Sequence, residues 1–463
     1  MCERNEHQSK QIEFELSPSW ENVAKSYLNN PKSRDDAINN FIELICSVKS
    51  HVSIAIDASW GSGKTFYIKQ AKMILDLNNP HLKKQYLENV DTTNIKADNI
   101  SELIANNPHV CVYYDAWRYD NHDDPILSLI YSITREFATN VKNDSEDFLT
   151  CLEDLVSIFD KVLPVNAKGF FDLLKDLSGK DIIEKIVQQE QLKDKINAFL
   201  NSLKQEKGNR IVIFIDELDR CSPLYAIRLL ERIKHYFDNE SITFIFSINK
   251  KELCQTIKKV YGYDFNAEKY LERFFDMTMP LPQFDMSAYC ESIMFKDPFE
   301  NTLEIINDIQ QTLGLTMREV SKLIRNAYSF SAFYNNLKSG GHYREEILNT
   351  IVFLYKLLVL PLLGLIAEDG RNKEILLAGN GYDLYKNLAD NIKVFDILSE
   401  RLSEFDGIKT KDDISKRIYA SYSEEYAKKN NITPISRFIA IKDVMKTAFD
   451  LPETFSNQPE IEQ

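Results

Sequence analysis

The sequence lacks paired cysteines. Its seven cysteines stand singly along 463 residues, and no C-x-x-C pair occurs. An odd and scattered set of this kind argues against a disulfide framework and indicates a reducing compartment, so we expect a cytoplasmic protein. The seven histidines show no spacing typical of metal ligands.

An excess of basic residues is also missing. Lysine and arginine number 56 against 70 aspartates and glutamates, which gives a formal charge of −14. This balance argues against a general attraction to nucleic acid or to anionic lipid. Local lysines at 69–85 and 248–259 are typical of solvated helix faces. These lysines leave one alternative open, namely that the protein is a motor that engages nucleic acid. Salt-dependent binding to DNA would support that alternative.

Long apolar runs are absent from most of the chain. Residues 1–20 are polar and contain no signal-peptide core. The apolar run at 351–366 includes Lys356 and Pro361, and it is shorter than the ~20 residues that a spanning helix needs. We predict a buried helical hairpin broken near Pro361, with a membrane-touching segment as the alternative. A membrane partner is therefore not expected.

What the chain does contain is an alternation of short β-branched runs with helical patterns. Apolar residues make up 44% of the sequence, which is enough for two or three domains with sizeable cores. The alternation predicts an α/β fold with a doubly wound parallel sheet. Its strands are expected at 51–57, 110–119, 210–220 and 242–249, with a last strand or edge near 276–282.

Two further regions have helical patterns without strands. Residues 142–207 are charged and predict a helical insertion, and the chain beyond about residue 286 is almost wholly helical in pattern. We therefore divide the sequence into an α/β core at 1–285 and a helical lid or C-terminal domain at 286–463.

The stretch "DASWGSGKT" at 57–65 lies between a predicted strand and a predicted helix. It ends like the phosphate-binding loop G-x-x-x-x-G-K-[ST], but Ala58 stands where the motif has its first glycine. Glycines give the backbone the freedom to wrap a phosphate, the lysine supplies charge, and the threonine hydroxyl can bind Mg²⁺. The residues predicted to bind the nucleotide are Ser59, Trp60, Gly61, Ser62, Gly63, Lys64, Thr65 and Phe66. Trp60 and Trp117 are expected to pack near the loop rather than to bind a base.

The apolar strand "IVIFIDELD" ends in two acids, Asp216 and Glu217. A carboxylate at a strand end can hold the water shell of Mg²⁺, and the next can accept a proton from the attacking water. Ordinary solvated acids are the alternative, but the loop in the same chain favours nucleotide binding. We predict Thr65 and Asp216 at the metal and Glu217 as the base.

Three more polar residues are candidates for the site. Asn249 closes a strand and could orient the attacking water, or it could simply form a turn. Arg273, in a predicted helix at 267–275, could act as an arginine finger in a neighbouring subunit. Arg318 could contact the nucleotide from the helical lid. The alternative for both arginines is a solvated helix charge. The pair Asp219–Arg220 could form an ion pair or line an oligomer contact.

These motifs together resemble those of the KAP family of P-loop NTPases. The resemblance spans roughly residues 18–330 and rests on the order of "SWGSGKT", "YYDAWRYDNHDDP", "FIDELDRCSP", "FIFSINKKELCQTIKKVYG", "YLERFFDMTMPLP" and "LTMREVSKLIR". It implies an α/β P-loop NTPase core with an extra strand between the loop strand and the acidic strand. It also implies ATP and Mg²⁺ as cofactors. Ala58 and Asn249 depart from the family pattern, and 142–207 lacks the transmembrane helices of many members, which favours a soluble protein.

The sequence therefore predicts a Mg²⁺-dependent ATPase that couples nucleotide state to conformational change or assembly. We expect a homo-oligomer, with a protein partner or effector in addition, and the resemblance suggests bacterial antiphage defence. The alternatives are a nucleotide-dependent scaffold with negligible turnover, which would need Lys64 but not Glu217, and the nucleic-acid motor.

Overall fold

The computed structural model describes residues 17–28, 35–81, 100–121, 124–138, 193–201, 204, 208–237, 239–282, 299–341, 343–393 and 411–434. Contacts divide the chain into two compact units. One is Ser17–Ser292, and the other is Ile293–Gln463 together with Met1–Leu16. Most of the predicted insertion at 142–207 lies outside the described residues. Its described residues, 193–201 and 204, are helical.

A parallel sheet of five strands forms the centre of the first unit. Its order is β2-β3-β4-β1-β5, and all of the paired strands run in the same direction. Burial on both faces explains why four of these strands are largely continuous apolar runs rather than alternating ones, whereas β5, at the edge of the sheet, is mostly exposed. The strands are β1 (Val52–Asp57), β2 (His109–Asp115), β3 (Arg210–Asp216), β4 (Ile242–Ile248) and β5 (Met277–Pro280).

The sheet confirms the predicted fold class. It also contains the strand that the family resemblance implies between β1, which precedes the phosphate loop, and β3, which ends in Asp216. That intervening strand is β4, which pairs with β1 on one side and with β3 on the other. Two predicted strands end earlier than expected. β2 stops at Asp115 and is followed by the short helical turn η2 (Trp117–Tyr119), and β3 stops at Asp216 before the turn η3 (Leu218–Arg220).

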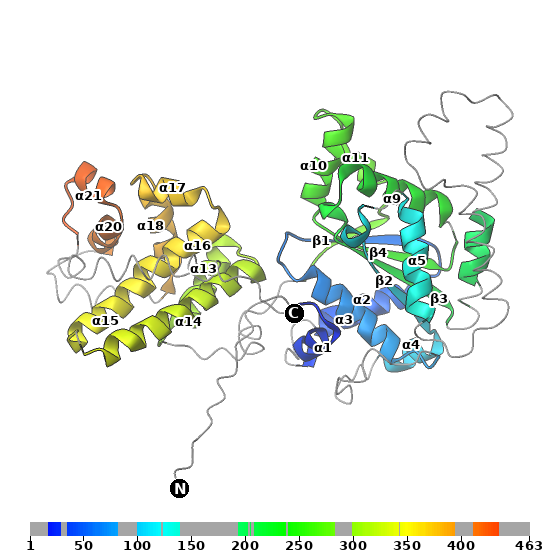
Figure 1. The fold of residues 1–463 in the computed structure, drawn as a ribbon, viewed down its shortest axis with the longest axis horizontal. Coiled ribbons are helices and arrows are strands. Elements are labelled where there is room, and N and C mark those ends of the chain that lie inside the picture. Colours follow the sequence, from blue (N-terminus) through cyan, green and yellow to red (C-terminus); the bar gives the residue numbers. More distant parts are fainter. Residues whose placement is uncertain are drawn as a thin grey trace, which may run out of the picture. The chain divides into compact units, whose positions relative to one another are not determined.

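Helices cover both faces of the sheet (Figure 1). Ile54 and Ile56 of β1 pack with α1 (Trp20–Leu28), α2 (Asp35–Ser47), α3 (Lys64–Leu77) and α4 (Ser101–Asn106). Ala55, on the opposite face of the same strand, packs with α5 (Pro125–Ala138), α9 (Pro223–Tyr236), α10 (Lys250–Tyr261) and α11 (Ala267–Leu271). This alternation follows from the two-residue period of a strand and makes the sheet doubly wound.

Strand order decides where the polar residues lie. Because β1, β4 and β3 are parallel neighbours, their carboxyl ends meet at one edge of the sheet. The loop after β1, Asn249 after β4, and Glu217 after β3 therefore share that edge, where open α/β sheets bind their ligands.

The second unit is helical in its described residues, 299–341, 343–393 and 411–434. A capping box starts α14 (Met317–Ser339): the Thr316 hydroxyl accepts the N–H of Glu319, and the Glu319 carboxylate accepts the N–H of Thr316. The helices are α13 (Thr302–Leu313), α14 (Met317–Ser339), α15 (Glu345–Leu354), α16 (Leu360–Glu368), α17 (Asn372–Leu377), α18 (Tyr382–Asn391), α20 (Lys411–Tyr422) and α21 (Glu424–Asn430).

The predicted hairpin break near Pro361 is wrong. Residues Glu345–Glu368 form one continuous helix, because a π-helical turn, η4 (Tyr355–Val359), joins α15 to α16 just before the proline. A wider turn accommodates the ring and the missing N–H of a proline inside a helix. Among the described residues this is the one helix long and apolar enough to cross a membrane, and 72% of its most apolar window is buried. It packs against α13, α14 and α18, as a core helix does.

Candidate nucleotide-binding site

The loop between β1 and α3 has the backbone of a phosphate cradle. Gly61 and Gly63 have φ angles of 80° and 92°, in the left-handed region that favours glycine. Helix α3 begins directly afterwards at Lys64, so its first N–H groups point toward the loop. Ala58 is not among the described residues with positive φ, and its N–H donates to the Ile248 carbonyl at 3.1 Å. Alanine therefore fits where the motif has glycine.

Lys64 is folded into its own loop. Its side chain is 9% exposed, and Nζ donates to the carbonyl oxygens of Ala58 at 2.7 Å and Ser59 at 3.1 Å. Burial lowers the pKa of the ammonium, while Asp219, Asp216 and other nearby acids oppose that shift. The loop thus holds a desolvated cation at the position where a phosphate-binding lysine is needed.

Asp216 is fixed at the end of β3. It is 1% exposed, its Oδ2 accepts the Tyr113 hydroxyl at 2.9 Å, and its Oδ1 accepts the N–H of Glu217 at 3.0 Å. These two hydrogen bonds hold the carboxylate in one orientation at the carboxyl end of β3. A carboxylate held in this way could serve as an oxygen ligand of Mg²⁺.

Glu217 follows Asp216 in a left-handed conformation with φ of 59°. Its Oε2 pairs with Nε of Arg220 at 2.5 Å. Burial, together with the charge of Asp216, raises the pKa of Glu217 to about 7, although Arg220 opposes the rise. A carboxyl group whose pKa lies near neutrality is suited to general base catalysis. Arg220 thus pairs with Glu217, and its guanidinium also lies 5.5 Å from the Trp117 ring centroid.

One contact that joins the two motifs has no signal in the sequence pattern. The Trp60 indole N–H donates to Oδ2 of Asp219 at 2.5 Å, which ties the phosphate loop to the acidic segment. Burial raises the pKa of Asp219, and the hydrogen bond from Trp60 is the largest opposing effect. The two residues are 159 positions apart, so only the strand order brings them together.

The other predicted residues of the first unit have these surroundings. Thr65 and Phe66 lie half-buried in the first turn of α3, while Ser59 is exposed. Ser62 donates its hydroxyl to the Ser59 carbonyl at 2.8 Å. The Asn249 side chain caps α10 by accepting the N–H of Glu252 at 3.3 Å. Its predicted sensor role stays a prediction beside this observed capping role.

The two arginine candidates lie in different units. Arg273 is exposed and lies in a turn, because α11 ends at Leu271, so the predicted helix at 267–275 is too long. The Lys234 ammonium donates to the Arg273 carbonyl at 2.6 Å and holds this turn against α9. Arg318 is exposed in the first turn of α14, in the second unit. Both proposed roles stay predictions.

Comparison with known proteins agrees with this geometry. The KAP family P-loop domain matches residues 34–343, more than half of the chain. The chain belongs to the KAP family of P-loop NTPases. The residues that match the family domain extend into the helical unit and include α13 and α14 of this KAP protein. The chain is also 22% identical over 166 residues to the uncharacterized protein MJ0182 of Methanocaldococcus jannaschii, covering 28% of this chain and 86% of that protein. Family membership indicates a nucleotide-binding protein.

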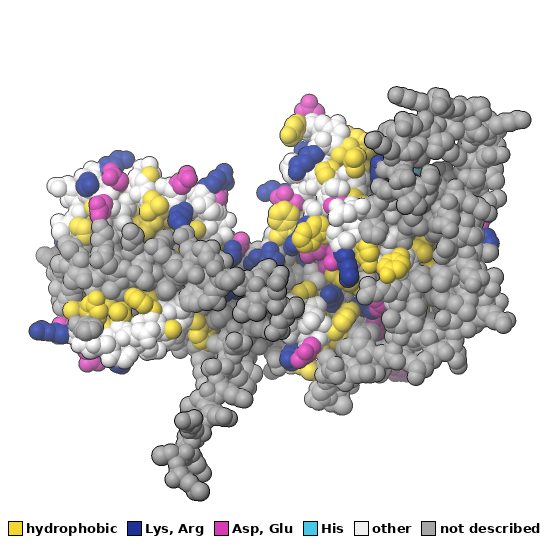
Figure 2. All heavy atoms as spheres, viewed as in Figure 1, with side chains coloured by type: hydrophobic (Ala, Val, Ile, Leu, Met, Phe, Trp, Pro, Cys, Tyr) yellow, Lys and Arg dark blue, Asp and Glu magenta, His cyan; other side chains and the backbone are white. Residues whose placement is uncertain are grey.

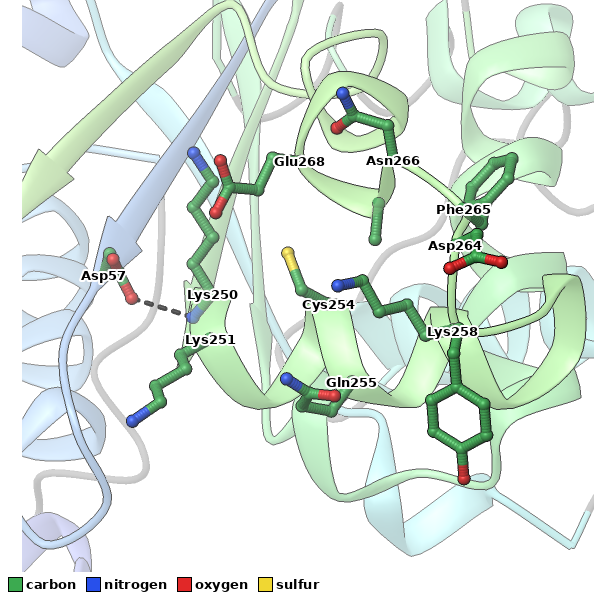
Figure 3. Close-up of a pocket in the computed structure, with 12 residues that line it drawn as sticks. Asp57, Lys250, Lys251, Cys254, Gln255, Lys258, Asp264, Phe265, Asn266 and Glu268 are labelled. Carbon is green, nitrogen blue, oxygen red and sulfur yellow. Dashed lines mark hydrogen bonds between the residues drawn. The ribbon is translucent and has the colours of Figure 1, made fainter.

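A separate cavity of about 540 Å³ in this KAP protein lies between α10 and α11 (Figure 3). Its lining includes Asp57, whose Oδ1 accepts the backbone N–H of Lys250 at 2.8 Å, but no residue of 58–66. Three lysines and three acids line it, namely Lys250, Lys251, Lys258, Asp57, Asp264 and Glu268. Because these charges balance, we do not assign phosphate binding to this cavity.

Figure 2 shows one face of this KAP protein. On its described surface, basic and acidic side chains are interspersed. This mixture is typical of a solvated surface. Among the described residues, no group of three His, Cys, Asp or Glu side chains is placed to hold a metal by itself.

Proposed function

We propose that this KAP protein binds ATP together with Mg²⁺ and hydrolyses it. The observation that carries the proposal is the meeting of a glycine loop, a buried lysine and an Asp-Glu pair at one edge of the sheet. The direct test is phosphate release from ATP by the purified chain with Mg²⁺ or with EDTA.

Each group has a distinct part in this proposal. The backbone N–H groups of the loop and the Lys64 ammonium would hold the phosphates. Thr65 and Asp216 would hold the cation, and bound Mg²⁺ would offset phosphate charge. Glu217 would accept a proton from water at its carboxylate, since its pKa of about 7 leaves a large ionised fraction at neutral pH.

The pKa of Glu217 predicts how hydrolysis depends on pH. Only the ionised carboxylate accepts a proton, so kcat/KM should rise with pH and reach half of its plateau near pH 7. Arg220 lowers the pKa of Glu217, so Arg220→Gln should move this midpoint to higher pH. The measurement is kcat/KM between about pH 5 and pH 9, roughly two units to each side of the midpoint. A flat profile, or a shift of the variant to lower pH, would contradict Glu217 as the base.

We further propose that the protein acts as a homo-oligomer in which Arg273 reaches the nucleotide of a neighbouring subunit. Its exposure and its place in a turn after β4 support this role. Arg273→Ala should retain ATP binding and lose most turnover. Mixing it with inactive Lys64→Ala should restore part of the activity, because one subunit supplies the arginine and the other the loop. If mixed oligomers form but stay inactive, Arg273 does not act on the nucleotide of a neighbouring subunit.

The output of hydrolysis in this proposal is a change of conformation or assembly that involves the helical unit, in the cytoplasm of a bacterium and in antiphage defence. One observation favours a second candidate, a nucleotide-dependent scaffold with negligible turnover. The Glu217–Arg220 ion pair at 2.5 Å restrains the proposed base. Tight ATP binding without phosphate release, unchanged in Glu217→Gln, would favour the scaffold.

A further inference from the structure

Tyr113 contacts the proposed Mg²⁺ carboxylate from the neighbouring strand. Its hydroxyl on β2 donates to Oδ2 of Asp216 on β3 at 2.9 Å, and the N–H of Glu217 occupies the other carboxylate oxygen at 3.0 Å. The two donors lie on opposite ends of the carboxylate, so together they fix its rotation. Loss of either donor would free the group to turn about its Cβ–Cγ bond.

The ring of Tyr113 is itself held by Lys69. The Lys69 ammonium lies 4.5 Å from the centroid of the Tyr113 ring and 5.5 Å from that of Trp20, and it donates to the Pro18 carbonyl at 2.8 Å. Lys69 follows Thr65 by four residues in α3, so both side chains lie on the same side of that helix. The Tyr113 ring thus lies between a clamped cation and Asp216.

We infer that Tyr113 is a positioning residue for the divalent cation, with Lys69 supporting its ring. This inference rests on the proposed function. Mg²⁺ requires near-ideal octahedral geometry, so a carboxylate that rotates freely binds it less well. Removal of a group that orients a metal ligand typically costs 10- to 100-fold in metal affinity. ATP binding without the cation should hardly change, because Tyr113 is not part of the phosphate loop.

Tyr114 provides a matched control on the same strand. Its side chain points to the opposite face of the sheet, where its hydroxyl contacts Ser128 at 2.7 Å and Tyr225 at 2.5 Å. Tyr114 is fully buried, more deeply than the half-buried Tyr113, so Tyr114→Phe removes an internal hydroxyl that has no contact with Asp216. A purely structural role of Tyr113 predicts similar behaviour of the two variants.

The experiment measures the affinity of the full chain for a fluorescent ATP analogue while Mg²⁺ is titrated from EDTA upward. For Tyr113→Phe, we expect the Mg²⁺ concentration at half-maximal effect to rise by about 10- to 100-fold, with the affinity in EDTA unchanged. Lys69→Met should also raise this Mg²⁺ concentration, but by a smaller factor. Tyr114→Phe should leave it at the wild-type value, even if its melting temperature falls.

The outcomes separate this inference from the proposed function. If Tyr113→Phe keeps the wild-type Mg²⁺ midpoint, the positioning role alone is overturned. The same holds if Tyr114→Phe shows the same shift as Tyr113→Phe. Wild-type protein whose ATP affinity is independent of Mg²⁺ overturns the proposed cation site and the inference with it. If Tyr113→Phe does not fold, Lys69→Met decides: a raised midpoint with unchanged affinity in EDTA supports the inference, and an unchanged midpoint overturns it.

Discussion

Lys64→Ala is expected to abolish measurable ATP binding. Lys64 is 9% exposed, and its ammonium is held within 3.1 Å of two loop carbonyls, so it is a desolvated charge at the point where phosphates would lie. Removal of one partner from a buried charge pair costs about 2–5 kcal/mol, or roughly 30- to several-thousand-fold in Kd. Equilibrium binding of labelled ATP to the purified variant measures this loss directly.

A second lysine variant makes this prediction specific. Lys250→Ala removes an ammonium that lines the cavity next to Asp57 and lies outside the loop. We expect it to bind ATP like the wild type, which would separate the loop lysine from general electrostatic attraction. Melting temperatures of both variants control for folding, since Lys64 also stabilises the loop through its own hydrogen bonds. A folded Lys64→Ala variant with wild-type affinity would refute the assignment of the loop.

Glu217→Gln is expected to retain ATP binding and to lose hydrolysis. Glutamine keeps the size of the side chain, but its amide cannot take the proton of the attacking water. Loss of a general base typically slows a reaction by ~10²–10⁴-fold. The measurement is single-turnover phosphate release alongside ATP affinity, with the exposed Glu268→Gln as the control. Turnover of Glu217→Gln within about threefold of the wild type, far below that range, would instead support the scaffold.

The sheet and the loop could be predicted because their patterns are local. Buried parallel strands are continuous apolar runs, and "GSGKT" between a strand and a helix specifies its own backbone conformation. The order of the strands was implied only by the family resemblance. This order places β4 between β1 and β3, and it therefore brings the phosphate loop to the same edge of the sheet as Asp216 and Glu217.

The contacts that tune the site could not be predicted in this way. The hydrogen bond from Trp60 to Asp219 and the one from Tyr113 to Asp216 span 159 and 103 positions, and no local pattern specifies either. Arg220 could have paired with Asp219, but the left-handed turn at Glu217 brings Glu217 to it instead. The continuous helix through Pro361 was missed because proline normally breaks helices, and the π-helical turn before it has no sequence pattern.

The central claim is that one edge of the sheet both binds ATP and cleaves it. The most direct measurement follows γ-labelled ATP bound to the wild type and to Glu217→Gln after Mg²⁺ is added. The account predicts that the wild type releases labelled phosphate while the variant retains intact ATP. Equal release from both proteins, or a wild type that binds no ATP, would contradict it.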